Sequence, residues 1–130
     1  MKSLMKPKGF SLIETLIALV ILAIALLALA GLMVTTTKNN SFGSHVTEAS
    51  TFAQGALETL RVARWTDIIS GNDTVTGGNG IRYNRVWTVT LQPSPPNDIL
   101  RVVNIAVNWT DAKNHSITVG PYNIMKPPGQ

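Results

Sequence analysis

The hydrophobic and polar positions divide the chain into three stretches. Residues 15–37 carry no charge and consist mainly of Leu, Ile, Val and Ala. A helix of about 20 such residues crosses the hydrocarbon core of a bilayer. From residue 38 the composition becomes polar while a helical period continues, and from residue 83 the apolar residues alternate with period two. The pattern therefore predicts a spanning helix, an amphipathic helix and a sheet, in that order.

The second stretch has one apolar stripe, in which spacings of four and three alternate. Its members are Phe42, Val46, Ala49, Ala53, Ala56, Leu60 and Ala63. A stripe of this period is typical of an amphipathic helix, and its small residues predict close approach to a sheet. A single helix from Phe10 to about Arg64 would be about 80 Å long. Because Gly31 and Gly43 weaken a helix, we expect any bend or break in the region from Thr35 to Ser44.

The third stretch reads as a small β-rich head. Runs at 83–92, 99–109 and 116–124 alternate apolar and polar residues, which predicts three strands. Residues 70–80 are rich in Gly and Asn and predict a surface loop. Short connections favour an antiparallel meander, one face of which can cover the helical stripe. The expected fold class is α+β, with a long N-terminal helix packed on a small antiparallel sheet.

Charge and composition narrow the functional classes. The chain has 11 Lys and Arg residues and 7 Asp and Glu residues. Three of the lysines, Lys2, Lys6 and Lys8, precede the apolar run. The net charge of +4 therefore belongs largely to the N-terminus and is poor evidence for a nucleic-acid surface. The chain has no cysteine, which excludes disulfides, thiolate catalysis and Cys-ligated metal sites.

The apolar run has two ordinary interpretations. A secretory signal peptide would explain the small-x-small pattern at residues 28–30, but the run is longer than such a peptide requires. A plain membrane anchor explains the length and the flanking lysines. It does not explain Glu14 at the start of the run, because acids are rare in spanning helices and usually have a partner there.

The residues around Glu14 support a third interpretation. The sequence from Lys8 to Glu14, KGFSLIE, resembles the N-terminal signature of type IV pilins and pseudopilins. Gly9, Phe10 and Glu14 match in type, order and spacing, and a short Lys-rich leader precedes them. Over about residues 8–33 the chain is most similar to minor pilins of the PilV type, the type IV pilus modification family.

This resemblance implies a processing site. In the family, prepilin peptidase cuts after the glycine, here Gly9, and the new N-terminal residue, here Phe10, is N-methylated. Glu14 would then lie about 6 Å along a helix from the charged amine of Phe10. A paired carboxylate is tolerated in a low-dielectric setting where a lone one is costly. The resemblance implies that Glu14 pairs with the terminal amine of a neighbouring subunit during assembly.

The predicted organisation follows from the cleavage site and the charges. Residues 1–9 form the leader, 10–37 the membrane and filament-core helix, 38–66 its amphipathic half, and 67–130 the head. Lys2, Lys6 and Lys8 place the N-terminus in the cytoplasm by the positive-inside rule, with the head in the periplasm. The implied partners are prepilin peptidase, the inner membrane, the assembly platform and other pilins or pseudopilins, with the pilus or pseudopilus as the final location.

The other candidate site residues have ordinary structural explanations. His45 and His115 lack a ligand pattern and are expected to be solvated or capping residues. Asp73 is expected to be a turn former in its loop rather than a calcium ligand. Arg85 should share a face with Trp87 and Arg82 the opposite one, so a nucleic-acid site is not expected.

We find no catalytic constellation, and we expect neither an enzyme nor a cofactor or metal site. The leading prediction is a structural subunit, a minor pilin that takes part in pilus assembly or modification and so in adhesion, twitching motility or DNA uptake. A type II secretion pseudopilin shares every N-terminal feature. The alternative from another class is a single-pass membrane protein whose head is a binding module that does not polymerise.

Overall fold

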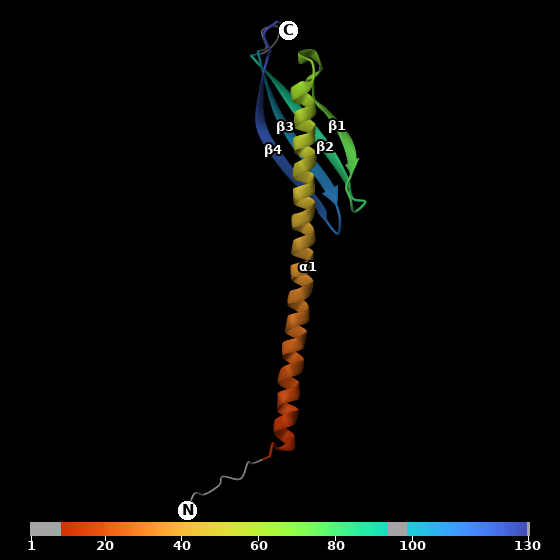
Figure 1. Cartoon of the computed structure of the whole chain (residues 1–130), viewed down its shortest axis with the longest axis vertical. Helices are drawn as coiled ribbons and strands as arrows, with labels where there is room; N and C mark the ends of the chain where they lie inside the picture. Colours follow the sequence, from red (N-terminus) through yellow and green to blue (C-terminus); the bar gives the residue numbers. More distant parts are fainter. Residues whose placement is uncertain (1–8, 94–98, 130) are drawn as a thin grey trace, which may run out of the picture. The chain divides into compact units, whose positions relative to one another are not determined.

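The computed structural model describes residues 9–93 and 99–129. Lys2, Lys6 and Lys8, predicted to set the topology, lie outside the described residues. The chain divides into two compact units, residues 1–41 and 42–130. The elements are α1 (Leu12–Val62), a short 3-10 turn η1 (Trp65–Asp67), β1 (Gly71–Thr76), β2 (Arg82–Gln92), β3 (Leu100–Thr110) and β4 (Asn114–Met125) (Figure 1).

The helix α1 is continuous through the region from Thr35 to Ser44, where any bend or break was expected. Residues 31–44 are all helical, so no break interrupts the helix there. Threonine is a weak helix former because its hydroxyl can compete for backbone groups. Here the hydroxyls of Thr35, Thr36 and Thr37 each donate to the carbonyl four residues earlier, at 2.9–3.1 Å. This back-bonding accommodates the three residues within the helix.

The sheet has four strands rather than the predicted three. Its order is β1-β2-β3-β4, and all neighbours are antiparallel, so the expected meander is confirmed. The additional strand β1 occupies part of the predicted loop at 70–80. Asp73 and Val75 face inward while Thr74 and Thr76 are exposed, so β1 does alternate despite its polar composition. Pairing with β2 overrides the turn preference of Gly, Asn and Asp.

The core of the second unit lies between α1 and one face of the sheet. From α1 it takes the predicted stripe, with Ala49, Ala53, Ala56 and Leu60 buried. The turn after the helix contributes Trp65 and Ile68. The central strands of the sheet contribute their inward residues Tyr83, Val103, Ile105, Val107 and Trp109. Alanines on the stripe allow the helix backbone to approach the larger residues of β3. The fold is the expected α+β arrangement of a long helix packed on an antiparallel sheet.

Candidate functional site

Gly9 and Phe10 lie immediately before α1 and are exposed. The helix begins at Leu12, and Phe10 is 83 % exposed. No other part of the described chain lies within 4 Å of a Cβ built on Gly9. The predicted cleavage position is therefore exposed and uncrowded.

Glu14 occupies the first turn of α1. Its backbone N–H donates to the carbonyl of Ser11 at 3.0 Å, and that of Thr15 donates to the same carbonyl at 3.2 Å. Ser11 is thus the N-cap residue that precedes the helix, and Ser11 and Glu14 have the S-x-x-E spacing of a capping box. An acid in the first turn also interacts favourably with the helix dipole, by about 0.3–1 kcal/mol. Glu14 therefore has a local structural role in addition to the predicted pairing.

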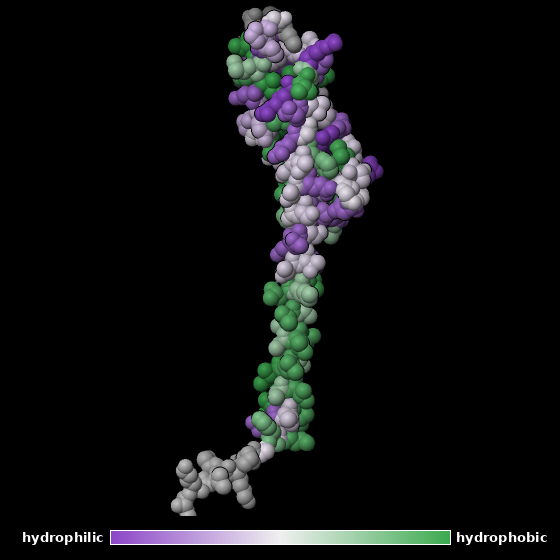
Figure 2. Space-filling model, viewed as in Figure 1, coloured by the Kyte–Doolittle hydropathy of each residue, from purple (hydrophilic) through white to green (hydrophobic). Residues whose placement is uncertain are grey.

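The first unit exposes an apolar surface along α1. Large side chains from Leu12 to Val34 are each at least half exposed, and Figure 2 shows apolar colour over this part of the helix. Within the described residues, α1 alone is long and apolar enough to cross a membrane. Soluble proteins seldom expose a continuous apolar surface of this extent, so this one requires lipid or other subunits as a cover.

In the second unit, a polar cluster joins α1 to the β1–β2 hairpin. The Tyr83 hydroxyl donates to Oε2 of Glu48 at 2.8 Å, and the N–H of Gly78 donates to Oε1 at 2.8 Å. His45 Nδ1 lies 3.3 Å from the Tyr83 hydroxyl and 3.1 Å from Nδ2 of Asn79. The cluster fixes the hairpin tip against the helix.

The electrostatics of this cluster follow from its hydrogen bonds. The N–H of Gly78, and next the hydroxyl of Tyr83, lower the pKa of Glu48 because they stabilise its ionised form. Burial, and next the carboxylate of Glu48, raise the pKa of Tyr83, which therefore stays a hydrogen-bond donor. His45 is buried within this cluster, so the prediction of a solvated or capping histidine was wrong for it.

Asp73 and Arg85 form a second contact between the sheet and α1. The Arg85 guanidinium donates to both carboxylate oxygens of Asp73, through Nε at 2.7 Å and through Nη2, and its Nη1 donates to the Phe52 carbonyl at 3.1 Å. Asp73 is thus a strand residue with a paired carboxylate, not a turn former. Arg85 faces inward with Trp87 and Arg82 faces outward, as predicted.

His115 belongs to an aromatic group at one end of the sheet. Its ring centroid lies 5.3 Å from that of Trp109 and 5.0 Å from that of Phe42. Nε2 of His115 lies 3.0 Å from Oδ1 of Asp111. The N–H of Lys113, and to a smaller degree His115, lower the pKa of Asp111. His115 is partly buried and has a structural role, so the solvated or capping interpretation was wrong for it too.

Sequence reasoning missed Glu48 and Tyr83 as a pair, although their positions carry a signal. Glu48 lies three residues after His45, beside the apolar stripe, and Tyr83 begins the inward series of its strand. Among the described residues, no group of three or more His, Asp or Glu side chains could hold a metal ion. The clusters of the second unit join its elements to one another.

A long N-terminal helix whose second half packs on an antiparallel sheet is the pilin-like α+β architecture. Residues 4–30 match the family model described as the prokaryotic N-terminal methylation motif. No curated protein and no solved structure gives a match. The motif supports a type IV pilin-like prepilin with a membrane-capable helix. It implies processing by prepilin peptidase and assembly with other pilins.

Proposed function

We propose that the chain is a minor pilin of the PilV type, a structural subunit and not an enzyme, which takes part in pilus assembly or modification. The observation that carries the proposal is the methylation motif at residues 4–30, followed by a helix that exposes an apolar surface. Gly9 and Phe10 form the cleavage site, and Phe10 is the residue that is methylated. The head is periplasmic before assembly and on the pilus surface afterwards.

Glu14 has a defined part in this proposal. Its carboxylate, in the first turn of α1, would be costly in lipid without a partner. The amine created at Phe10 of a neighbouring subunit supplies an opposite charge, and attraction between charges is stronger at low dielectric. The pairing favours insertion of the helix into a filament over its remaining alone in the membrane.

Replacing Glu14 by Gln tests this role. Gln keeps the capping-box pattern and the side-chain length but removes the charge. We expect the E14Q prepilin to be processed normally while its amount in sheared surface filaments falls at least about tenfold, which corresponds to about 1.4 kcal/mol. The measurement is the ratio of the chain in the sheared fraction to that in the membrane fraction.

Glu58→Gln is the matched control, because Glu58 lies on the same helix in an exposed ion pair with Arg61 at 3.9 Å. Such a pair contributes only tenths of a kcal/mol. Normal incorporation of E14Q would contradict the pairing. Absence of the wild-type chain from sheared pili, together with a secretion defect on its deletion, would support a type II secretion pseudopilin instead. Absence from filaments of both kinds would support the non-polymerising anchor.

A further inference from the structure

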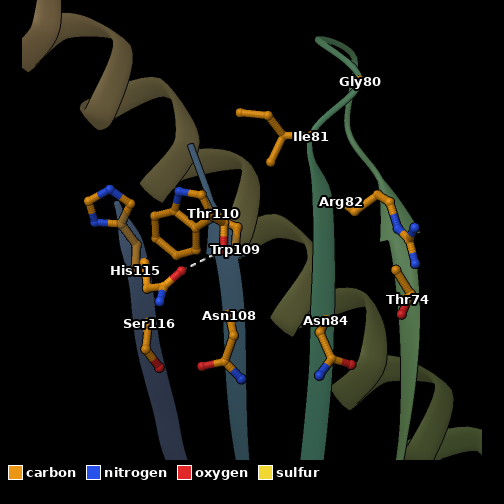
Figure 3. A pocket seen from close by; sticks show the side chains of 11 residues that line it. Thr74, Gly80, Ile81, Arg82, Asn84, Asn108, Trp109, Thr110, His115 and Ser116 are labelled. Carbon is orange, nitrogen blue, oxygen red and sulfur yellow. Dashed lines mark hydrogen bonds between the residues drawn. The ribbon is translucent and has the colours of Figure 1, made fainter. Parts of the chain in front are cut away.

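The outward face of the sheet, away from α1, is formed mainly by amides and hydroxyls. One row crosses all four strands in register, with Thr74 opposite Asn84, Asn84 opposite Asn108, and Asn108 opposite Ser116. Figure 3 shows these four side chains next to one another on neighbouring strands. At a strand spacing of about 4.8 Å, the row spans about 14 Å.

This row forms part of the floor of an open depression of about 900 Å³. The hairpin tip at Gly80 and Ile81 lies at one side of it. Arg82, Thr110 and Asn114 also line it. The Thr110 hydroxyl donates to Oδ1 of Asn114 at 2.8 Å, which leaves the amide N–H groups of Asn114 for another acceptor. The volume is within the range of small-molecule sites, about 300–1,000 Å³.

Of the residues that the structure describes, Arg82 is the one Lys or Arg that lines the depression, whose lining also includes His115, bound to Asp111. Among the described residues it has no ion pair, whereas Arg85 binds Asp73 and Arg61 lies beside Glu58. Within the described part of the chain no carboxylate lines the depression, and Asp111, beside it, is bound to His115, so neither compensates the charge of Arg82. A guanidinium presents paired donors that match a carboxylate bidentately.

The lining selects among ligand classes. Asparagine amides both donate and accept, as do hydroxyls, so a ligand with many hydroxyl groups can satisfy the row. A polynucleotide would need several cations to neutralise its phosphates, and the depression offers one arginine. An apolar ligand would leave the amides unpaired at a cost. A carboxylate attached to a polyhydroxylated ring meets both requirements.

We propose that this depression binds an acidic saccharide, with Arg82 on the carboxylate of a uronic acid unit and the row from Thr74 to Ser116 on its hydroxyls. The inference goes beyond the proposed role in assembly, because it assigns a ligand to the head. It concerns a face of the head and does not depend on processing at Gly9. Its failure would therefore leave the assembly proposal intact.

Calorimetric titration of the full chain in detergent micelles tests the site with matched ligands. The probe is a trimer of galacturonic acid, and its methyl ester keeps the hydroxyls but lacks the charge. We expect the ester to bind about tenfold more weakly than the acid, as loss of a charge-assisted pair predicts. Arg82→Gln should weaken binding of the acid by the same factor and leave binding of the ester unchanged.

Arg64→Gln is the control, because Arg64 is exposed and does not line the depression. It should leave both affinities unchanged. Asn108→Ala, in the row, should weaken acid and ester alike, and circular dichroism shows whether each variant is folded. Equal binding of acid and ester, equal loss in the two arginine variants, or absence of binding by the acid trimer would overturn the proposal. Displacement of the trimer by a single-stranded DNA oligonucleotide at lower concentration would assign the site to nucleic acid and overturn it too.

Discussion

Tyr83 shows how a single residue connects the elements of the head. Its ring lies 5.2 Å from that of Phe52 on α1 and 5.7 Å from that of Trp109 on β3, while its hydroxyl reaches Glu48. The side chain is fully buried, so its hydroxyl needs the hydrogen bond that Glu48 accepts. Loss of that acceptor leaves the buried hydroxyl with only the longer contact to His45 Nδ1 at 3.3 Å, and a poorly satisfied buried polar group is costlier than the net value of the bond.

Glu48 makes the head sensitive to acid. Because its pKa is lowered in the folded chain, the carboxylate stabilises the fold fully above its ordinary pKa of 4.5. This contribution is lost as the pH falls through the lowered value. Glu48→Gln should therefore reduce the melting temperature at pH 7 and make it less dependent on pH below about 4.5.

Thermal unfolding followed by circular dichroism between pH 3 and 7 measures this effect. His45 is present in both proteins, so the difference between the two curves isolates Glu48. Glu58→Gln, at an exposed position of the same helix, should follow the wild-type curve closely. Parallel curves for wild type and E48Q below pH 4.5 would contradict the assignment.

At the scale of elements, the helix stripe depends on small residues. Ala53 is 1 % exposed and lies where α1 meets the sheet. Ala53→Leu should destabilise the head by about 1–3 kcal/mol, because the added carbons have no space between packed elements. Gln54→Leu, at the neighbouring exposed position, tests whether added volume alone matters and should cost less than about 0.5 kcal/mol.

Denaturant unfolding of the two variants gives the free energies directly. A53L with wild-type stability would mean that the helix does not pack on the sheet as closely as described. Equal losses in A53L and Q54L would mean that the cost arises elsewhere, for example through association of the chains.

Strand β4 has a glycine that the sheet requires. Gly120 has φ +127°, and a Cβ there would lie 2.9 Å from the backbone oxygen of Val103, next to the irregular register between Val103 and Ile105. Gly120→Ala should cost about 1–3 kcal/mol or more. Thr118→Ala, at an exposed position of the same strand, is the comparison in urea unfolding. Equal stability of G120A and T118A would show that the strand relaxes around the new methyl group.

The elements differ in how far the sequence predicts them. The stripe from Phe42 to Ala63 predicts the packed face of α1, and alternation predicts β2, β3 and β4, since both periods are local properties of the chain. Strand β1 depends on pairing with β2 and on the contact of Asp73 with Arg85, which no local pattern contains. Its Thr-Val-Thr run was the available signal, but the neighbouring Gly and Asn residues favoured a loop.

The candidate sites also differ in how far the sequence predicts them. Gly9, Phe10 and Glu14 are close in sequence, so their spacing alone carries the processing motif. The cluster of His45, Glu48 and Tyr83 joins residues more than 30 positions apart, and the row on the outward face joins four strands. Such groups depend on strand register, which the sequence constrains only weakly before the fold is known.

At the scale of the whole molecule, the two units have different requirements. Residues 12–34 expose apolar side chains that need lipid or other subunits, whereas the second unit has its own core between α1 and the sheet. A pilin-like prepilin meets both requirements in turn, first in the membrane and then, in our proposal, in a filament. Its central step is the cut between Gly9 and Phe10, because that cut creates the amine that Glu14 is proposed to bind.

Mass spectrometry of the N-terminus of the chain purified from its native membranes tests this step most directly. We expect a mature chain that starts at Phe10 and carries one N-methyl group, and Gly9→Val should block that processing. A start at Gly31, as a conventional signal peptidase would produce, would contradict this prediction, and so would an intact chain that starts at Met1.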